Sequence, residues 1–258
     1  MGLPKISVII PSYNKVKFIG RTLESIFSQK YNNLEVIVQD GASTDGTVKI
    51  IEKYADKYPK TLFWESKKDS GQLDAINKGL GHAGGDIVTY INADDCYLYG
   101  SFERVADAYQ SNPNALWFAG QGLVVDRQGR EIAKLASLYK SFWLRLNTYN
   151  TLLSFNYLMQ PSVFLTMKTY KEFGPFTGTQ NFVTEYDLWL KLGKIQMPKV
   201  LMTKISEFRI EPSTKTKRMF KNLLLEDEKI VRKYTQNPLI LVLHKLHNLG
   251  RELVEKFI

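Results

Sequence analysis

Four short apolar segments of the chain are each followed directly by polar side chains. The polar groups occupy residues 11–14, 40–46, 67–69 and 92–95. In a parallel sheet the carboxyl ends of the strands meet at one edge, and ligands bind there. The sequence therefore predicts a single site that these four segments build together.

Two adjacent carboxylates, Asp94 and Asp95, follow the fourth apolar segment. Carboxylates at the end of a buried strand are unfavourable unless a cation or hydrogen-bond donors meet them. A hard divalent ion such as Mn²⁺ or Mg²⁺ suits this position, because it prefers carboxylate oxygens together with substrate phosphates. The alternative is that one of the two caps the following helix. We expect Asp94 and Asp95 to bind a divalent metal.

The elements that position these residues are read from the hydrophobic pattern. Short β-branched runs alternate with amphipathic stretches, which predicts a Rossmann-like, mainly parallel sheet flanked by helices. Ser43 or Thr44 is expected to cap the second helix. The predicted strands are 6–10, 34–38, 62–64 and 87–91, and the predicted helices are 18–29, 43 or 44 to 58, 72–78 and 101–109.

The pattern changes after the fourth helix. The apolar runs 116–118 and 123–125 precede the turn sequence 126–129, and we interpret this region as a hairpin. A further helix is expected over 187–192. Beyond Pro212 the sheet ends, and two helical segments separated by Asn237-Pro238 are expected.

Composition limits the class of protein. The chain has 258 residues, 44% of them hydrophobic and 24% charged, which is typical of one globular domain with a tail. Cys96 is the only cysteine, so neither an internal disulfide nor a cysteine-rich zinc site is expected. The first residues lack the regions of a signal peptide, and no apolar run is long enough to span a bilayer. We therefore expect a cytoplasmic protein.

The net charge of +9 is concentrated in part at the C-terminal end. Residues 213–258 hold ten Lys or Arg and five Asp or Glu, and leucines and valines recur there at helical spacing from Leu239 to Val254. Such a basic helix suits packing on its own domain, pairing with a second subunit, or peripheral contact with an anionic membrane. The charge comes without any nucleic-acid-binding motif, so nucleic acid is not expected as a partner.

Taken together, the polar motifs resemble family 2 glycosyltransferases of the GT-A fold. No single motif is specific, but their number, order and spacing are. The resemblance implies a glycosyltransferase domain over 1–212, with a nucleotide-sugar half at 1–97 and an acceptor half at 98–212, followed by the helical tail 213–258. The segments that carry the resemblance are 7–14, 40–47, 69–71, 74–79, 92–95, 160–164, 185–190 and 208–216.

The resemblance also implies a donor site. The nucleotide base is expected at Pro11, Tyr13 and Asp40, because an aromatic ring can stack on uracil and a carboxylate can accept its imide proton. The DXD-like signature maps to residues 92–94, where Asn92 replaces the first carboxylate and leaves Asp94 for the metal. Lys67 and Asp69 are also expected near the donor, and the cations Arg209 and Lys215 are expected beside its phosphates.

The catalytic base implied by the resemblance is Glu185, which stands where relatives more often have aspartate. Its carboxylate would take the proton from the acceptor hydroxyl, and a single displacement would invert the anomeric configuration. Asp187 is expected either to support this base or to serve as a helix-start carboxylate. Gln160 and Trp189 are expected on the acceptor side.

The implied function is transfer of a sugar from a nucleotide-diphosphate sugar, with UDP as the expected nucleotide, to a saccharide or lipid-linked acceptor in surface polysaccharide or glycolipid synthesis. Two alternatives stay open: a sugar nucleotidyltransferase and a silent nucleotide-sugar-binding protein. A nucleotidyltransferase would be expected to carry a glycine-rich loop after the first strand, and this chain has none there. The match to G-x-G-x-x-G at 79–84 follows a helix and precedes a strand, so it does not indicate a dinucleotide site.

Overall fold

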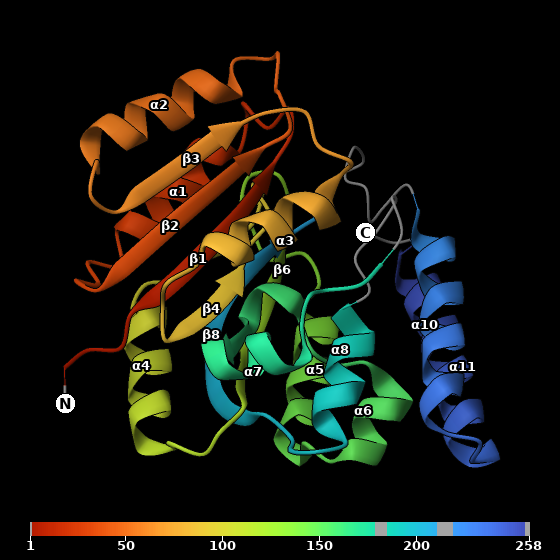
Figure 1. Cartoon of the computed structure of the whole chain (residues 1–258). Coiled ribbons are helices and arrows are strands. Elements are labelled where there is room, and N and C mark those ends of the chain that lie inside the picture. Colours follow the sequence, from red (N-terminus) through yellow and green to blue (C-terminus); the bar gives the residue numbers. More distant parts are fainter. Residues whose placement is uncertain (1, 179–184, 211–218, 256–258) are drawn as a thin grey trace.

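Four parallel strands form the N-terminal half of one eight-stranded sheet. The computed structural model describes residues 2–178, 185–210 and 219–255 (Figure 1). The parallel strands lie in the order β3-β2-β1-β4, with Ser12, Asp40 and Ser66 aligned at the ends of β1, β2 and β3. The elements of this half are β1 (Ile6–Ser12), α1 (Ile19–Phe27), β2 (Leu34–Asp40), α2 (Thr47–Lys57), β3 (Leu62–Ser66), α3 (Gln72–His82) and β4 (Ile87–Tyr90).

The second half of the sheet is mixed. β7 lies antiparallel between β4 and β6, whereas β8 runs parallel to β6 and antiparallel to β5. The sheet is thus mainly parallel but not purely so. Its elements are β5 (Cys96–Tyr97), α4 (Ser101–Ser111), β6 (Trp117–Val125), α5 (Lys134–Leu146), α6 (Tyr149–Phe155), the 3₁₀ turn η1 (Gln160–Ser162), β7 (Val163–Thr166), α7 (Met167–Phe173), α8 (Glu185–Gly193) and β8 (Lys199–Arg209).

Two local expectations need correction. The expected hairpin is wrong, because 117–118 and 123–125 belong to the single strand β6. Among the described residues, the segment after the turn forms one bridging pair with β6, Val125 with Glu131. Helix α2 begins at Thr47 after Gly46, with no side-chain cap from the expected Ser43 or Thr44. Instead the carboxylate of Asp45 accepts a hydrogen bond from the Thr47 backbone N–H at 3.0 Å.

The core lies on both faces of the sheet. Side chains alternate along β1, so that Ile6, Val8 and Ile10 pack on one face and Ile9 on the other, and all four are fully buried. Burial on both faces explains why these strands are continuous apolar runs. The helices cover the two faces and leave the carboxyl ends of the strands for the polar segments.

The C-terminal tail consists of α10 (Phe220–Tyr234) and α11 (Pro238–Glu255). α10 packs on α8, and α11 packs on α6 and α10, at one side of the molecule (Figure 1). Ile230, Val231 and Ile240 join the main core cluster. The tail therefore packs on its own chain through one side of each helix. Among the described residues, no helix has the length and apolar character needed to cross a membrane.

Candidate active site

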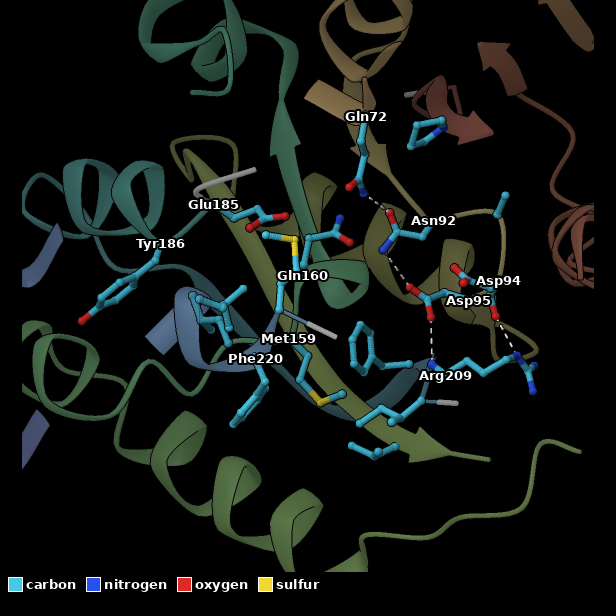
Figure 2. Close-up of a pocket in the computed structure, with 18 of the residues that line it drawn as sticks. Gln72, Asn92, Asp94, Asp95, Met159, Gln160, Glu185, Tyr186, Arg209 and Phe220 are labelled. Carbon is cyan, nitrogen blue, oxygen red and sulfur yellow. Dashed lines mark hydrogen bonds between the residues drawn. The ribbon is translucent and has the colours of Figure 1, made fainter. Parts of the chain in front are cut away.

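A cavity of about 1940 Å³ lies at the carboxyl ends of the parallel strands. Residues after each of β1 to β4 contribute to its lining, so the four polar segments do come together. On its other side the cavity is lined by Gln160, Glu185 and Phe220 of α10 (Figure 2). Further side chains of α5, α10 and α11 complete this wall. Polar strand ends thus face an opposing wall that combines apolar side chains with the carboxylates Glu185, Glu226 and Asp227.

Asp94 is the carboxylate of the strand-end wall. It follows β4 in the turn 92–95, lines the cavity, and pairs with the ammonium of Lys15, whose Nζ lies 2.5 Å from Asp94 Oδ2. Lys15 follows β1, and it was not predicted because nothing in the local sequence indicates a partner 79 residues away. The pair shows that Asp94 faces a position where a cation is favourable.

Asp95 has a different role from the one expected. Its side chain is buried, with Oδ1 accepting from the Arg209 backbone N–H at 2.8 Å and Oδ2 accepting from Asn92 Nδ2 at 3.2 Å (Figure 2). Burial, with the charge of Asp94 adding to it, holds the pKa of Asp95 well above its ordinary value. Both oxygens are therefore engaged by the protein, and metal binding by Asp95 is not supported by this geometry.

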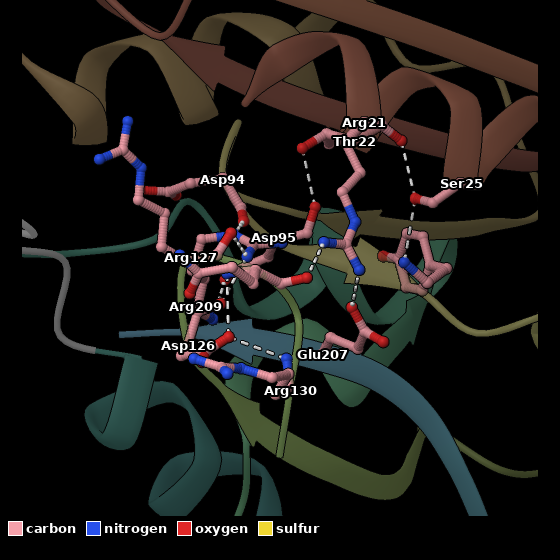
Figure 3. Close-up of polar contacts among 12 residues, drawn as sticks. Arg21, Thr22, Ser25, Asp94, Asp95, Asp126, Arg127, Arg130, Glu207 and Arg209 are labelled. Atoms are coloured by element: carbon pink, nitrogen blue, oxygen red, sulfur yellow. Dashed lines mark hydrogen bonds and ion pairs between the residues drawn. The ribbon is translucent and has the colours of Figure 1, made fainter. Parts of the chain in front are cut away.

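Arg209, expected at the donor phosphates, is instead bound to backbone carbonyls. It is 2% exposed, and its guanidinium donates to the carbonyl oxygens of Asp94 at 2.8 Å, Asp126 at 2.6 Å and Arg127 at 2.8 Å (Figure 3). Arg209 thus ties the turn after β6 to the turn that carries Asp94. Lys215 lies outside the described residues.

A divalent metal fits the residues present only with help from a substrate. The described residues contain no group of three or more His, Cys, Asp or Glu side chains able to hold a metal on their own. Asp94 supplies one carboxylate directed into the cavity, and Mg²⁺ is commonly held by one or two carboxylates plus substrate phosphates. A site completed by diphosphate oxygens therefore agrees with this donor set.

The remaining donor-side residues fall into two groups. Pro11, Tyr13, Asp69 and Asn92 line the cavity, and the ring of Tyr13 is 63% exposed and free to stack on a planar ligand. Asn92 Oδ1 accepts from Gln72 Nε2 at 2.6 Å, which fixes its orientation. The structure brings these four together at the expected edge.

Asp40 and Lys67 do not line the cavity. The carboxylate of Asp40 is 2% exposed and accepts hydrogen bonds from the Ser43 N–H and hydroxyl and from the Ser66 hydroxyl, at 2.6 to 2.8 Å. Lys67 pairs with Glu65 on the surface, and the neighbouring Lys68 lines the cavity instead. Asp40 therefore stabilises the loop after β2, and its burial keeps the carboxylate out of the cavity lining.

Glu185 stands at the start of α8, on the wall opposite Asp94. Its carboxylate is partly buried and accepts a short hydrogen bond from the hydroxyl of Tyr90, which is itself buried in β4. Burial raises the pKa of Glu185 to about 7, although the bond from Tyr90 acts in the opposite direction. A carboxylate with such a pKa is well suited to accept a proton near neutral pH.

Gln160 lies beside Glu185 and presents an acceptor atom without a donor. Its Nε2 donates to the Tyr90 carbonyl at 2.7 Å, whereas its Oε1 is buried and has no hydrogen-bond partner in the described chain. Buried polar atoms are normally satisfied. The orphaned Oε1 therefore marks a place where a ligand hydroxyl would be stabilised.

The other two residues expected here are mainly structural. Trp189 lines the cavity but is 3% exposed and stacks on Trp117 with ring centroids 5.5 Å apart. Asp187 does not line the cavity; it lies in the first turn of α8 and pairs with Lys233 at 3.3 Å. Of the two roles considered for Asp187, its position agrees with the helix-start carboxylate.

Known proteins of similar fold bind nucleotide sugars. The mannosyltransferase PcManGT from Pyrobaculum calidifontis, solved with GDP-Man and Mn²⁺, matches with a TM-score of 0.68 and 19% identity over 96% of this chain and 70% of its own. S. aureus TarS 1–349, solved with UDP-GlcNAc, matches with a TM-score of 0.62 and 20% identity over 89% and 71%. At these identities the likeness establishes the fold, and it confirms the predicted α/β architecture.

Sequence relatives give the family. The putative glycosyltransferase EpsE of Bacillus subtilis (strain 168) is 30% identical over 194 residues, which is 73% of this chain and 66% of EpsE. The chain spans 34% and 58% of the lengths of glycosyltransferase relatives from Nostoc and Haemophilus influenzae. The family model described as glycosyl transferase family 2 matches residues 7–160, more than half of the chain. The chain therefore belongs to glycosyl transferase family 2.

Proposed function

We propose that the chain transfers a sugar from a nucleotide-diphosphate sugar to an acceptor hydroxyl by a single displacement that inverts the anomeric configuration. One observation carries this proposal: a single cavity is lined by Asp94 at a strand end and, on the opposing wall, by Glu185 with its pKa raised to about 7. An inverting transfer needs charge stabilisation for the leaving group and a base on the far side of the sugar.

The donor side is assigned to the strand ends. Tyr13 offers an exposed ring for stacking on the nucleotide base, and the buried Ser12 hydroxyl has no partner in the described chain. Solved structures of similar fold hold UDP-GlcNAc, and GDP-Man with Mn²⁺, which supports a nucleotide-sugar donor and a divalent metal without selecting the base. Uridine is proposed on the resemblance alone.

The diphosphate is assigned to the region of Asp94 and Lys15. When bound, a divalent ion would neutralise charge that develops on the departing diphosphate. Asp94 would hold that ion, and the ammonium of Lys15, now paired with Asp94, is close enough to turn toward a phosphate oxygen. Asn92, fixed by Gln72, offers a neutral amide to the ribose or sugar hydroxyls.

The acceptor is assigned to the side of Gln160 and Glu185. The acceptor hydroxyl donates to Glu185, and a second hydroxyl of the acceptor donates to Gln160 Oε1, which has no other donor in the described chain. As the acceptor oxygen bonds to the anomeric carbon, its proton passes to Glu185, and the bond between the anomeric carbon and the diphosphate oxygen breaks. Tyr90 keeps the carboxylate oriented through its hydroxyl.

The proposed role is assembly of cell-surface polysaccharide or glycolipid, with a saccharide or lipid-linked acceptor and peripheral contact with a membrane. The support is the set of relatives, which includes a protein named for minor teichoic acid biosynthesis in Bacillus subtilis, 31% identical over 43% of this chain and 12% of that protein.

The deciding experiment measures nucleotide release by the full chain from UDP- and GDP-sugars with Mn²⁺, with Glu185→Gln as the control. Metal-dependent release that falls by about 100-fold or more in the control supports the proposal. Donor binding without release above the control would indicate a silent binding protein. Pyrophosphate formation from a nucleoside triphosphate and a sugar phosphate would indicate a nucleotidyltransferase. NMR of the product decides whether the anomeric configuration is inverted.

A further inference from the structure

Helix α11 buries two polar side chains together with Ile240 and exposes most of its large apolar ones. His244 and Asn248 are 1% and 2% exposed, and His244 stacks on Tyr186 and bonds to the Leu153 carbonyl at 2.9 Å. Large apolar side chains face outward instead, with Leu239 at 65% exposure. A helix on a protein in water normally has the opposite arrangement. The exposed apolar residues of α11 are Leu239, Val242, Leu246, Leu249, Leu253 and Val254.

Helix α5 also exposes large apolar side chains, although its Leu144 is buried in the core. Its Ser137 is buried, whereas Leu135 is 83% exposed. Four large apolar side chains recur at intervals of three or four residues, so they form one stripe along the helix. The exposed apolar residues of this stripe are Leu135, Leu138, Phe142 and Leu146. These four residues and the six exposed apolar residues of α11 make up the α5–α11 face.

The two stripes belong to neighbouring helices. The ring of Tyr139 on α5 stacks on His247 of α11 with centroids 5.6 Å apart, and the Tyr139 hydroxyl lies 3.0 Å from His247 Nδ1. Both helices lie on the side of the molecule that carries the tail (Figure 1). Leu135 and Leu246 belong both to the α5–α11 face and to the lining of the catalytic cavity. The cavity therefore opens at this face.

The charge around the face is mainly basic, and the acidic Glu252 of α11, next to Leu253, pairs with Lys221. Residues 132–171 contain five Lys or Arg and no Asp or Glu, and residues 229–251 contain another five without a carboxylate side chain. Of these, Lys134, Arg145 and Lys245 lie on α5 and α11 and are exposed. A second copy placed on this face would bring like charges together, whereas an anionic lipid surface complements them.

We infer that the α5–α11 face lies on an anionic lipid bilayer, with its leucines and Phe142 among the headgroups and its lysines and arginines on lipid phosphates. The observations are the ones expected of an interfacial helix pair: a continuous apolar side, basic residues at its border, and no helix able to span the membrane in the described chain. The cavity mouth then meets the bilayer.

One consequence concerns the acceptor. A hydroxyl carried by a membrane lipid would enter the cavity between α5 and α11 and reach Glu185 without leaving the interface. This consequence rests on the proposed glycosyl transfer, whereas binding of the face to a bilayer does not depend on it.

The experiment is sedimentation of the full chain with vesicles of phosphatidylcholine alone or with 30% phosphatidylglycerol. We expect binding to the anionic vesicles that weakens with salt. Phe142→Ser should lower the partition coefficient about tenfold, because an exposed phenylalanine no longer enters the interface. Phe63→Ser is the matched control, since Phe63 is similarly exposed, 51% against 57%, but lies on the edge strand β3. Arg145→Gln should lower binding about fivefold on anionic vesicles only.

Three results would overturn the inference: no binding to anionic vesicles at low salt, equal losses in Phe142→Ser and Phe63→Ser, or a lipid-free dimer that Phe142→Ser dissociates. The last would assign the face to a second copy of the chain. Nucleotide release with a water-soluble acceptor, measured on the same samples, tests the proposed function separately. Nucleotide release without binding to vesicles would refute the membrane face alone. Binding to vesicles without nucleotide release would refute only the proposed glycosyl transfer.

Discussion

Replacing Glu185 with glutamine is expected to stabilise the protein at the pH where it abolishes turnover. Burial raises the pKa of this carboxyl from 4.5 to about 7, so the native state binds its proton more tightly than the unfolded chain does. A raised pKa contributes stability that is present below pH 4.5 and is lost as the pH rises through about 7. At pH 8 the native protein therefore carries the full cost of a buried charge, which a neutral amide does not have.

The size of the effect follows from the shift. The pKa of Glu185 differs by about 2.5 units between the folded and unfolded states, which corresponds to about 3.4 kcal/mol at 1.36 kcal/mol per pKa unit. Glu185 is partly open to the cavity, so water screens its charge and a gain of about 1–2 kcal/mol at pH 8 is the realistic expectation. For a chain of this size the gain raises the melting temperature by about 2–6 °C. The hydroxyl of Tyr90 can still donate to the glutamine oxygen, so packing is retained.

The assay is thermal and urea unfolding of both proteins at pH 4.5 and pH 8, alongside nucleotide release. The stability advantage should be present at pH 8 and disappear at pH 4.5, while turnover falls by about 100-fold or more. Asp187→Asn is the matched control, since this carboxylate of the same helix turn pairs with Lys233 outside the cavity and should show no gain at pH 8. A glutamine variant that is less stable at pH 8, or equally stabilised at both pH values, would refute the reasoning.

Three further predictions concern the two walls of the cavity. Asp94→Asn should weaken metal-dependent donor binding at least tenfold and leave the fold intact, as measured by calorimetry with and without a chelator; unchanged affinity would place the metal elsewhere. Tyr90→Phe should shift the acidic limb of the kcat/KM profile to higher pH by about one pH unit, because the hydrogen bond from Tyr90 lowers the pKa of Glu185. An acidic limb that does not move would exclude Glu185 as the base. Arg209→Met should lower the free energy of unfolding by about 2–4 kcal/mol in urea titrations, because three backbone carbonyls lose their hydrogen-bond donor. If the variant keeps full stability but no longer binds the nucleotide sugar, Arg209 contacts the phosphates instead.

The first half of the fold was predictable because local signals agree with one another. β1, β2 and β4 contain β-branched runs that are largely buried, β3 is a short edge strand with Phe63 exposed, and each of the four is followed by an amphipathic helix or a polar turn. Parallel pairing of β1 with β2 and of β2 with β3 then aligns the strand ends Ser12, Asp40 and Ser66. The location of the site at the strand ends needed no information beyond this alternation.

The failure at β6 has a steric origin. Gly120 and Gly122 interrupt the apolar pattern, and the pairing with β8 shifts register there. A Cβ at Gly120 would lie 2.0 Å from Ile205, and one at Gly122 would lie 2.8 Å from Met159. The glycines permit close packing inside one strand, whereas in the sequence they resemble a break between two. Only the partners across the sheet distinguish the two cases.

The site residues were predicted by position more reliably than by role. Glu185 and Asp94 line the cavity, but their partners Tyr90 and Lys15 lie 95 and 79 residues away in sequence and carry no local signal. Asp40 and Arg209 have the charge expected of ligand-binding residues, yet the protein itself supplies their hydrogen-bond partners. Whether a polar group is free to bind a ligand depends on tertiary neighbours.

Helix α11 illustrates a similar limit for apolar groups. Its leucines and valines recur at helical spacing as predicted, and such a stripe is normally assigned to the core. The structure instead buries Ile240, His244 and Asn248 on one side, where His244 and Asn248 bond to backbone carbonyls. The spacing identified the stripe, but a hydrophobic pattern cannot say whether the medium facing it is protein or lipid. Because the side of α11 with Ile240, His244 and Asn248 already meets the core, the exposed apolar side is the one that we propose lies on a bilayer.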